Sequence, residues 1–132
     1  MFAFFSVIAA AVLSFVLGTA WYGTLSGAWI RVSGVPVNEN GQPQNGANPT
    51  LYVAGFIMQL IVAGMMYHVF ATAGVDGIFA GLVAGLGVGL LFITPWIALN
   101  NAYSGRPVLL TVIDGGYATL GCAAMGLVLG LF

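Results

Sequence analysis

Apolar residues fill four long segments of this chain, and polar residues gather in the breaks between them. The segments run from about Phe2 to Tyr22, Leu51 to Ala73, Gly77 to Leu99 and Val108 to Phe132. Each has roughly the 20 residues that a helix needs to cross the hydrocarbon core of a bilayer, which is about 30 Å thick. The pattern therefore predicts four membrane-spanning helices arranged as two hairpins.

The same pattern argues against a β-barrel. A barrel would show segments of about ten residues that alternate apolar and polar side chains, and none is present. Because backbone polar groups in lipid must be satisfied within the protein, helices are the remaining solution. We expect an all-α, integral membrane four-helix bundle, with residues 1–132 forming a single transmembrane domain and an extramembrane loop at about residues 30–50.

Composition supports a lipid-facing surface. Hydrophobic residues make up 61% of the chain and charged residues 4%, against about 25% charged in soluble domains. Membrane lipids are therefore expected partners, and two basic residues are too few for nucleic acid. No basic residue precedes the first apolar segment, so we expect it to be retained as a span and not cleaved as a signal.

The two basic residues predict an orientation. Arg31 and Arg106 follow the first and third segments, and loops that carry Arg or Lys tend to remain cytoplasmic. Four spans place both loops on one side, so the loops after helices 1 and 3 are expected to be cytoplasmic. Both termini and the turn around Asp76 then lie on the other side.

Small residues recur every fourth position in three of the segments, which places them in one stripe on each helix. Such stripes let helix backbones approach closely. They indicate either packing within the bundle or a docking face for another subunit, a lipid or a pigment. The stripes comprise Ser6, Ala10, Ser14 and Gly18; Gly77, Gly81, Gly85 and Gly89; and Ala118, Cys122, Gly126 and Gly130.

Aromatic residues cluster where the first and third helices are expected to end. Amphipathic rings favour the headgroup region, so we predict interfacial anchors at Trp21, Tyr22, Trp29 and Trp96. Pro95 lies in the last turns of the third helix and should kink or end it, because proline lacks a backbone donor.

Asp114 is an ionisable residue inside the fourth segment, where a charge is expensive and suggests function. Arg106 and Arg31 are expected at the same membrane face, and an Arg–carboxylate pair would lower the desolvation cost of both groups. We therefore predict a structural clasp or polar site, to which Asn100 and Asn101 would add. A proton or cation path would need further polar groups, and the rest of this segment offers only Thr119.

His68 is the single histidine, deep in the second segment. Its imidazole is suited either to an interhelical or interfacial hydrogen bond or to ligation of a pigment, haem or metal. Gln59 lies nine residues earlier, near the opposite helix face, so the two are not expected to form one site. The residues that could supply a second haem ligand are Met58, Met65 and Met66.

No serine or cysteine is paired with a base at a suggestive spacing, so we expect no catalytic site. No metal site is expected either: Cys122 has no second cysteine with which to bind a metal or form an intrachain disulfide.

Three sequence stretches resemble a known family. These are WYGTLSGAW from Trp21 to Trp29, NNAYSGRP from Asn100 to Pro107, and IDGGY from Ile113 to Tyr117. In their order and spacing they resemble the small bacterial membrane-protein family called domain of unknown function 1761. The resemblance implies a four-helix bundle in the bacterial cytoplasmic (inner) membrane, with no assigned activity. It draws attention to Trp21, Tyr22, Gly27, Trp29, Asn100, Asn101, Arg106, Pro107, Asp114 and Tyr117.

The chain departs from that family between the first two spans, where an Asn-, Gly- and Pro-rich stretch replaces an expected charged segment.

Three functions remain open. The leading hypothesis is a non-catalytic accessory or assembly subunit that packs against other membrane protein subunits. The alternative is a small oligomeric transporter or channel with Asp114, Asn100, Asn101 and Arg106 at a polar entrance. The third is a pigment or haem binder through His68; otherwise no cofactor beyond lipid is required.

Overall fold

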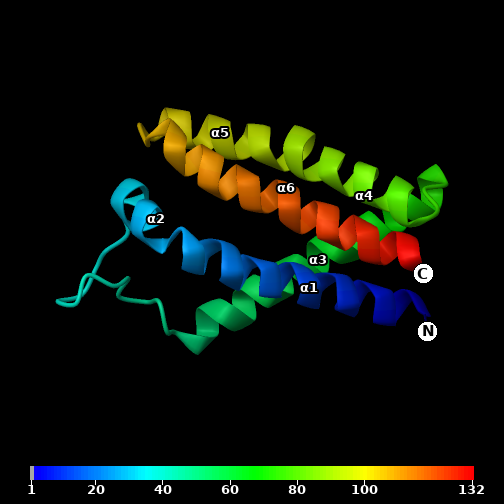
Figure 1. Cartoon of the computed structure of the whole chain (residues 1–132), viewed down its shortest axis with the longest axis horizontal. Helices are drawn as coiled ribbons and strands as arrows, with labels where there is room; N and C mark the ends of the chain where they lie inside the picture. Colours follow the sequence, from blue (N-terminus) through cyan, green and yellow to red (C-terminus); the bar gives the residue numbers. More distant parts are fainter. Residues whose placement is uncertain (1) are drawn as a thin grey trace.

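The computed structural model describes residues 2–132 and is all-α (Figure 1). Four stretches are long and apolar enough to cross a membrane, which confirms the predicted spans. The third of them, Ile78–Tyr103, consists of three consecutive helical elements. The elements are α1 (Phe2–Thr24), α2 (Ser26–Ser33), α3 (Pro49–Ala73), α4 (Ile78–Gly87), η1 (Val88–Ile93), α5 (Thr94–Tyr103) and α6 (Val108–Leu131).

The helix boundaries differ from the predicted ones by a few residues, most of all at two places. The short helix α2 continues the chain to Ser33, where Gly34 in the left-handed conformation ends it, so the loop begins four residues later than expected. The third span runs to Tyr103 instead of Leu99. Helix α3 begins at Pro49, because the Asn48 side chain caps it by accepting a hydrogen bond from Thr50 N–H and proline is favoured in the first turn.

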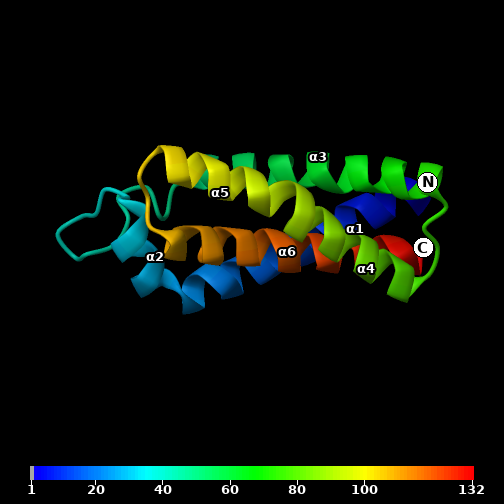
Figure 2. The same cartoon turned by 90° about the horizontal axis from the view of Figure 1, so that it is seen from above.

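Helix α6 is the centre of the structure. It lies between α1 on one side and the run α4, η1 and α5 on the other, and both views show it in the middle (Figures 1 and 2). In its most apolar window 44% of residues are buried, against 28% or less in the other spans. Helix α3 packs mainly on α1 and contacts α6 over a shorter stretch. The bundle is therefore built around α6, and α3 is held mainly by α1.

The two ends of the bundle differ. The loop of residues 34–48, α2 and the α5–α6 turn lie at one end, which we call the loop end (Figure 1). The beginning of α1, the end of α6 and the α3–α4 turn lie at the other, the terminal end (Figure 1). The loops that carry Arg31 and Arg106 are thus on the same side, as the sequence predicts.

The small-residue stripes of the third and fourth spans pack against each other. A Cβ added at Gly81 would collide with the carbonyl oxygen of Gly126, and one at Gly85 would collide with that of Cys122. Gly89 meets the backbone at Ala118 and Thr119. The backbones touch because neither helix has a side chain between them. These stripes are a packing seam inside the bundle.

The stripe of the first span also faces α6. Ser6, Ala10, Ser14 and Gly18 are all buried. The ring of Tyr117 fills the space above Gly18, where a Cβ would lie 2.7 Å from its oxygen. The first helix therefore uses its small residues to admit a tyrosine from α6.

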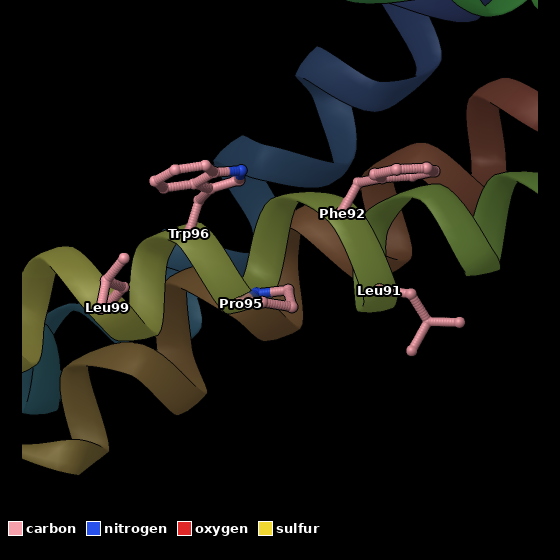
Figure 3. Close-up of a pocket in the computed structure, with 5 residues that line it drawn as sticks. All are labelled: Leu91, Phe92, Pro95, Trp96 and Leu99. Atoms are coloured by element: carbon pink, nitrogen blue, oxygen red, sulfur yellow. The ribbon is translucent and has the colours of Figure 1, made fainter.

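Pro95 does not end the third span. The chain widens into the π-helical turn η1 just before it, and Thr94 N–H bonds to the carbonyl of Gly89, five residues earlier. Such a turn accommodates the ring that an ordinary α-helical turn would exclude. On the outer surface, Pro95 sits in a shallow groove of about 200 Å³ lined by Leu91, Phe92, Trp96 and Leu99 (Figure 3).

Thr94 fastens this widened turn to α6. Its hydroxyl lies 2.7 Å from the Gly89 oxygen and 3.1 Å from the Gly115 oxygen. Thr94→Val keeps the shape and removes these bonds, so we expect the free energy of unfolding to fall by about 1 kcal/mol. Denaturant titration in micelles would measure it. Thr72→Val, at an exposed threonine bonded only within its own helix, is the matched control and should change little. Equal effects of the two substitutions would contradict this role.

An apolar core closes the terminal end of the bundle. The buried residues there include Ala10, Ala63, Met66, Phe70 and Leu129. They bring α1, α3 and α6 together over the half of the helices that lies nearer the chain ends. Toward the loop end this core gives way to open space.

Candidate functional site

A cavity of about 1230 Å³ lies between α1, α3, α5 and α6. It exists because α3 is held by α1 and does not pack against α5 at the level of Ile93 and Ile97, which line the opposite wall. The loop residues 42–47 border the cavity at the loop end. The cavity does not extend beyond Ser14, Val62 and Met125 toward the terminal end, where the apolar core lies, and it is open to its surroundings elsewhere.

One set of polar side chains in the cavity links α1 to α6 near the loop end. The Tyr22 hydroxyl donates to the Asp114 carboxylate, with 2.7 Å between the oxygens. Next to it, the indole N–H of Trp21 donates to the Ile113 carbonyl at 2.9 Å. The Trp29 ring packs edge-on against the Tyr22 ring, with 6.1 Å between centroids. Asp114 is therefore held by an aromatic lining and remains only partly buried.

A second polar group joins three helices and is called here the Tyr117 junction; it consists of Ser14, Gln59 and Tyr117. The Tyr117 hydroxyl on α6 donates to the Ser14 carbonyl on α1, and the Gln59 amide N–H on α3 donates to the Tyr117 oxygen, both at 2.7 Å. The Ser14 hydroxyl lies 3.4 Å from the same oxygen. This junction is the polar link of α3 to the rest of the bundle within residues 2–132.

The junction leaves one polar atom without a partner. The side-chain oxygen of Gln59 is buried and accepts no hydrogen bond from residues 2–132. A buried, unsatisfied acceptor is destabilising by about 1 to 3 kcal/mol.

The deeper part of the cavity is apolar. Phe15, Val62, Ile93, Cys122 and Met125 line it, in the direction of the terminal end. The cavity thus has a polar end near Asp114 and an apolar end near the bundle centre. That division matches an amphipathic molecule rather than a wholly polar solute.

The predicted Arg–Asp clasp is not formed. Within residues 2–132 no ion pair joins Asp114 to Arg106 or Arg31, and the partner of Asp114 is Tyr22. The reason is geometric: α1 packs directly on α6, so its tyrosine reaches the carboxylate, while both arginines are exposed at the loop end.

The two asparagines are separated from this site. Asn101 is buried and its amide donates to the Thr111 hydroxyl at 3.0 Å, while its backbone carbonyl accepts from Arg106 N–H. Asn100 is exposed. Asn101 therefore shapes the α5–α6 turn, and neither asparagine lines the cavity.

Two of the predicted interfacial anchors have other contacts. Trp21 and Tyr22 point toward α6, where their polar atoms bond to Ile113 and Asp114. Their role as interfacial anchors stays a prediction. Trp29 borders the cavity. Trp96 is 65% exposed on the outer surface, a position that suits an anchor.

His68 lies away from the cavity. Its side chain is exposed, one turn from the end of α3, and its backbone carbonyl accepts from Thr72. Met58 and Met65 are also exposed, whereas Met66 is buried in the core. No group of three or more His, Cys, Asp or Glu side chains in residues 2–132 is placed to hold a metal ion. Gln59 and His68 belong to different sites, as the helix geometry predicts.

Sequence reasoning considered Gln59 only in relation to His68 and missed its link to Tyr117. A signal was present, because Gln59 is the one glutamine within the four apolar segments, and polar side chains in lipid need partners. Its partner could not be read from the sequence, since 58 positions separate the two residues.

Among residues 2–132, the side-chain hydrogen-bond partner of the Ser14 hydroxyl is Tyr117 and that of Asp114 is Tyr22, so neither is paired with a base. The arrangement is suited to holding a molecule by hydrogen bonds at one end and by apolar contacts at the other.

No curated protein and no solved structure matches this chain. One family does: the sequence model described as "Protein of unknown function (DUF1761)" matches residues 5–130. Of the residues that suggested this family, Trp21, Tyr22, Trp29, Asp114 and Tyr117 meet around the contact of α1 with α6. Because the match covers nearly the whole chain, the protein belongs to the DUF1761 family.

Proposed function

We propose that the protein is a non-catalytic accessory or assembly subunit of the bacterial cytoplasmic membrane, and that it holds an amphipathic, lipid-like molecule in its cavity. The observation that carries this proposal is the large cavity with one polar and one apolar end. A volume of about 1230 Å³ is larger than the 300 to 1,000 Å³ of common small-molecule pockets, and suits a long-chain molecule.

The surface available to a partner subunit follows from the packing. The small-residue stripes are occupied inside the bundle, so a partner would contact the outer apolar faces instead. The groove around Pro95 is one such face, where Leu91, Phe92 and Trp96 are 65% to 71% exposed (Figure 3). A second copy of the chain would use the same faces.

We further infer that the loop end faces the cytoplasm. Arg31 and Arg106 are both exposed at this end, and the positive-inside rule assigns such loops to the cytoplasmic side. The polar end of the cavity then opens toward the cytoplasmic leaflet.

Gentle extraction from native membranes, followed by native mass spectrometry and lipid analysis, tests the proposal. We expect stoichiometric partner proteins and one amphipathic molecule per chain. Val62→Trp should displace that molecule by filling the cavity wall. Val83→Trp, on the outer surface of α4 at 53% exposure, is the matched control and should retain it.

The outcomes separate the two parts of the proposal. A protein that migrates alone contradicts the role as a subunit. An empty cavity in the wild-type protein, or a molecule retained equally by both variants, contradicts the cavity as its binding place. Visible absorbance in the same fraction would instead support pigment binding at His68.

Transport is the second candidate, because the partly buried Asp114 lies inside a cavity that opens near the loop end. The core around Phe70 and Leu129 blocks passage through a single chain, so conduction would require an oligomer or a rearrangement. Unchanged solute flux in liposomes after Asp114→Ala would contradict transport.

A further inference from the structure

The donors of the two polar groups in the cavity are engaged within the protein, while Ser26, Asn38, Gln42 and Asn45 offer both donors and acceptors elsewhere in the lining. The Tyr22 hydroxyl is committed to Asp114, the Tyr117 hydroxyl to the Ser14 carbonyl, and the Gln59 amide N–H to Tyr117. At the two polar groups, the second oxygen of the Asp114 carboxylate remains as an acceptor, whereas the Gln59 oxygen is buried and not accessible from the cavity. A head group that reaches Asp114 therefore donates a hydrogen bond to it.

The charge of the site also favours a head group that donates hydrogen bonds. Asp114 is a carboxylate lining the cavity, and no ion pair with Arg31 or Arg106 neutralises it within residues 2–132. Both arginines are exposed and neither lines the cavity. In a low-dielectric surrounding, a carboxylate favours a cationic donor over a neutral one.

We infer that the cavity binds an amphipathic molecule with a protonated amine head, which donates a hydrogen bond to Asp114, and an apolar chain that extends toward Met125. This inference rests on the proposed function, which it narrows from lipid-like molecules in general to long-chain amines. The alkyl chain of this molecule contacts Val62, Ile93 and Cys122 along the apolar part of the cavity.

Cys122 supplies a built-in reporter. It is the only cysteine, it is buried, and it lines the apolar part of the cavity. A chain that occupies the cavity therefore shields the thiol from N-ethylmaleimide. The extent of modification over time, followed by intact-protein mass spectrometry in detergent micelles, reports occupancy of the cavity.

Four probes with the same chain separate head-group properties: dodecylamine, dodecyltrimethylammonium, dodecanol and dodecanoate, each at one mole fraction in the micelle. Dodecylamine carries both charge and donors, and should slow modification about tenfold more than dodecanoate, as expected for one charge-assisted hydrogen bond. Dodecyltrimethylammonium, which has the charge without donors, and dodecanol, which has a donor without the charge, should fall between them.

Substitutions at the carboxylate test the assignment of the head group. Asp114→Asn should reduce the advantage of dodecylamine over dodecanol, whereas Asp76→Asn, in the exposed α3–α4 turn, should leave it unchanged. Tyr22→Phe frees the carboxylate oxygen that Tyr22 occupies, so both oxygens can accept, and it should increase the advantage. Opposite signs at Asp114 and Tyr22 cannot arise from a general loss of structure.

The results distinguish this inference from the proposed function. Equal protection by all four probes would overturn the amine head and leave lipid-like binding in place. Protection by none would overturn both. The midpoint of thermal unfolding, measured on the same samples, gives a second ranking of the probes, so a thiol that reacts slowly does not leave the inference untested.

Discussion

Gly85→Ala is expected to lower the free energy of unfolding by about 3 kcal/mol, because it forces two backbones apart. A Cβ at this position would collide with the carbonyl oxygen of Cys122 and lie 3.1 Å from the Gly126 Cα atom. Both obstacles are backbone atoms of α6, so no side chain can rotate to relieve the contact. The helices α4 and α6 must separate along the seam that builds the second hairpin.

The matched control is Gly87→Ala in the same helix, where a new Cβ would meet nothing within 4 Å. Both substitutions gain about 1 kcal/mol of helix propensity, so the difference between them isolates the collision. Denaturant unfolding in micelles, followed by circular dichroism, provides the measurement. Equal stability of the two variants would show that α4 does not pack on α6 through Gly85.

The fold could be predicted from the sequence to the extent that it depends on local pattern. Length and apolarity define the spans, and four-residue spacing of Gly81, Gly85 and Gly126 identifies a close helix contact. The pattern does not say which helix lies opposite. For that reason the sequence favours packing within the bundle but leaves a docking face for another subunit open, and the contact with α6 decides between them.

The candidate site was less predictable, because its members come from three helices. Asp114 was identified as the costly charge in lipid, but charge pairing suggested Arg106, and the actual partner is the Tyr22 hydroxyl. Tyr22 lies 92 positions away, and its distance depends on how α1 crosses α6. The cavity depends on an absence of contact between α3 and α5, which no local sequence pattern records.

Tyr117→Phe is expected to loosen α3 and to lower the free energy of unfolding by about 2 kcal/mol. The ring remains, so its packing over Gly18 is kept, but the hydroxyl that joins the Ser14 carbonyl and the Gln59 amide is lost. The Gln59 oxygen already lacks a partner. Its amide N–H would then lose one as well, leaving a whole buried amide unsatisfied in an apolar surrounding.

Tyr67→Phe is the matched control, since Tyr67 lies on the outer face of α3, 39% exposed, and should tolerate loss of its hydroxyl. A double-mutant cycle with Gln59→Leu separates the hydrogen bond from the ring. Leucine removes the amide that Tyr117→Phe leaves without a partner. Tyr117→Phe should therefore be less destabilising in the Gln59→Leu background, with a coupling energy of about 1 kcal/mol. Additive effects would show that Gln59 and Tyr117 do not act together. Coupling would establish that α3, the wall of the cavity, is fastened to α6 by this one polar contact.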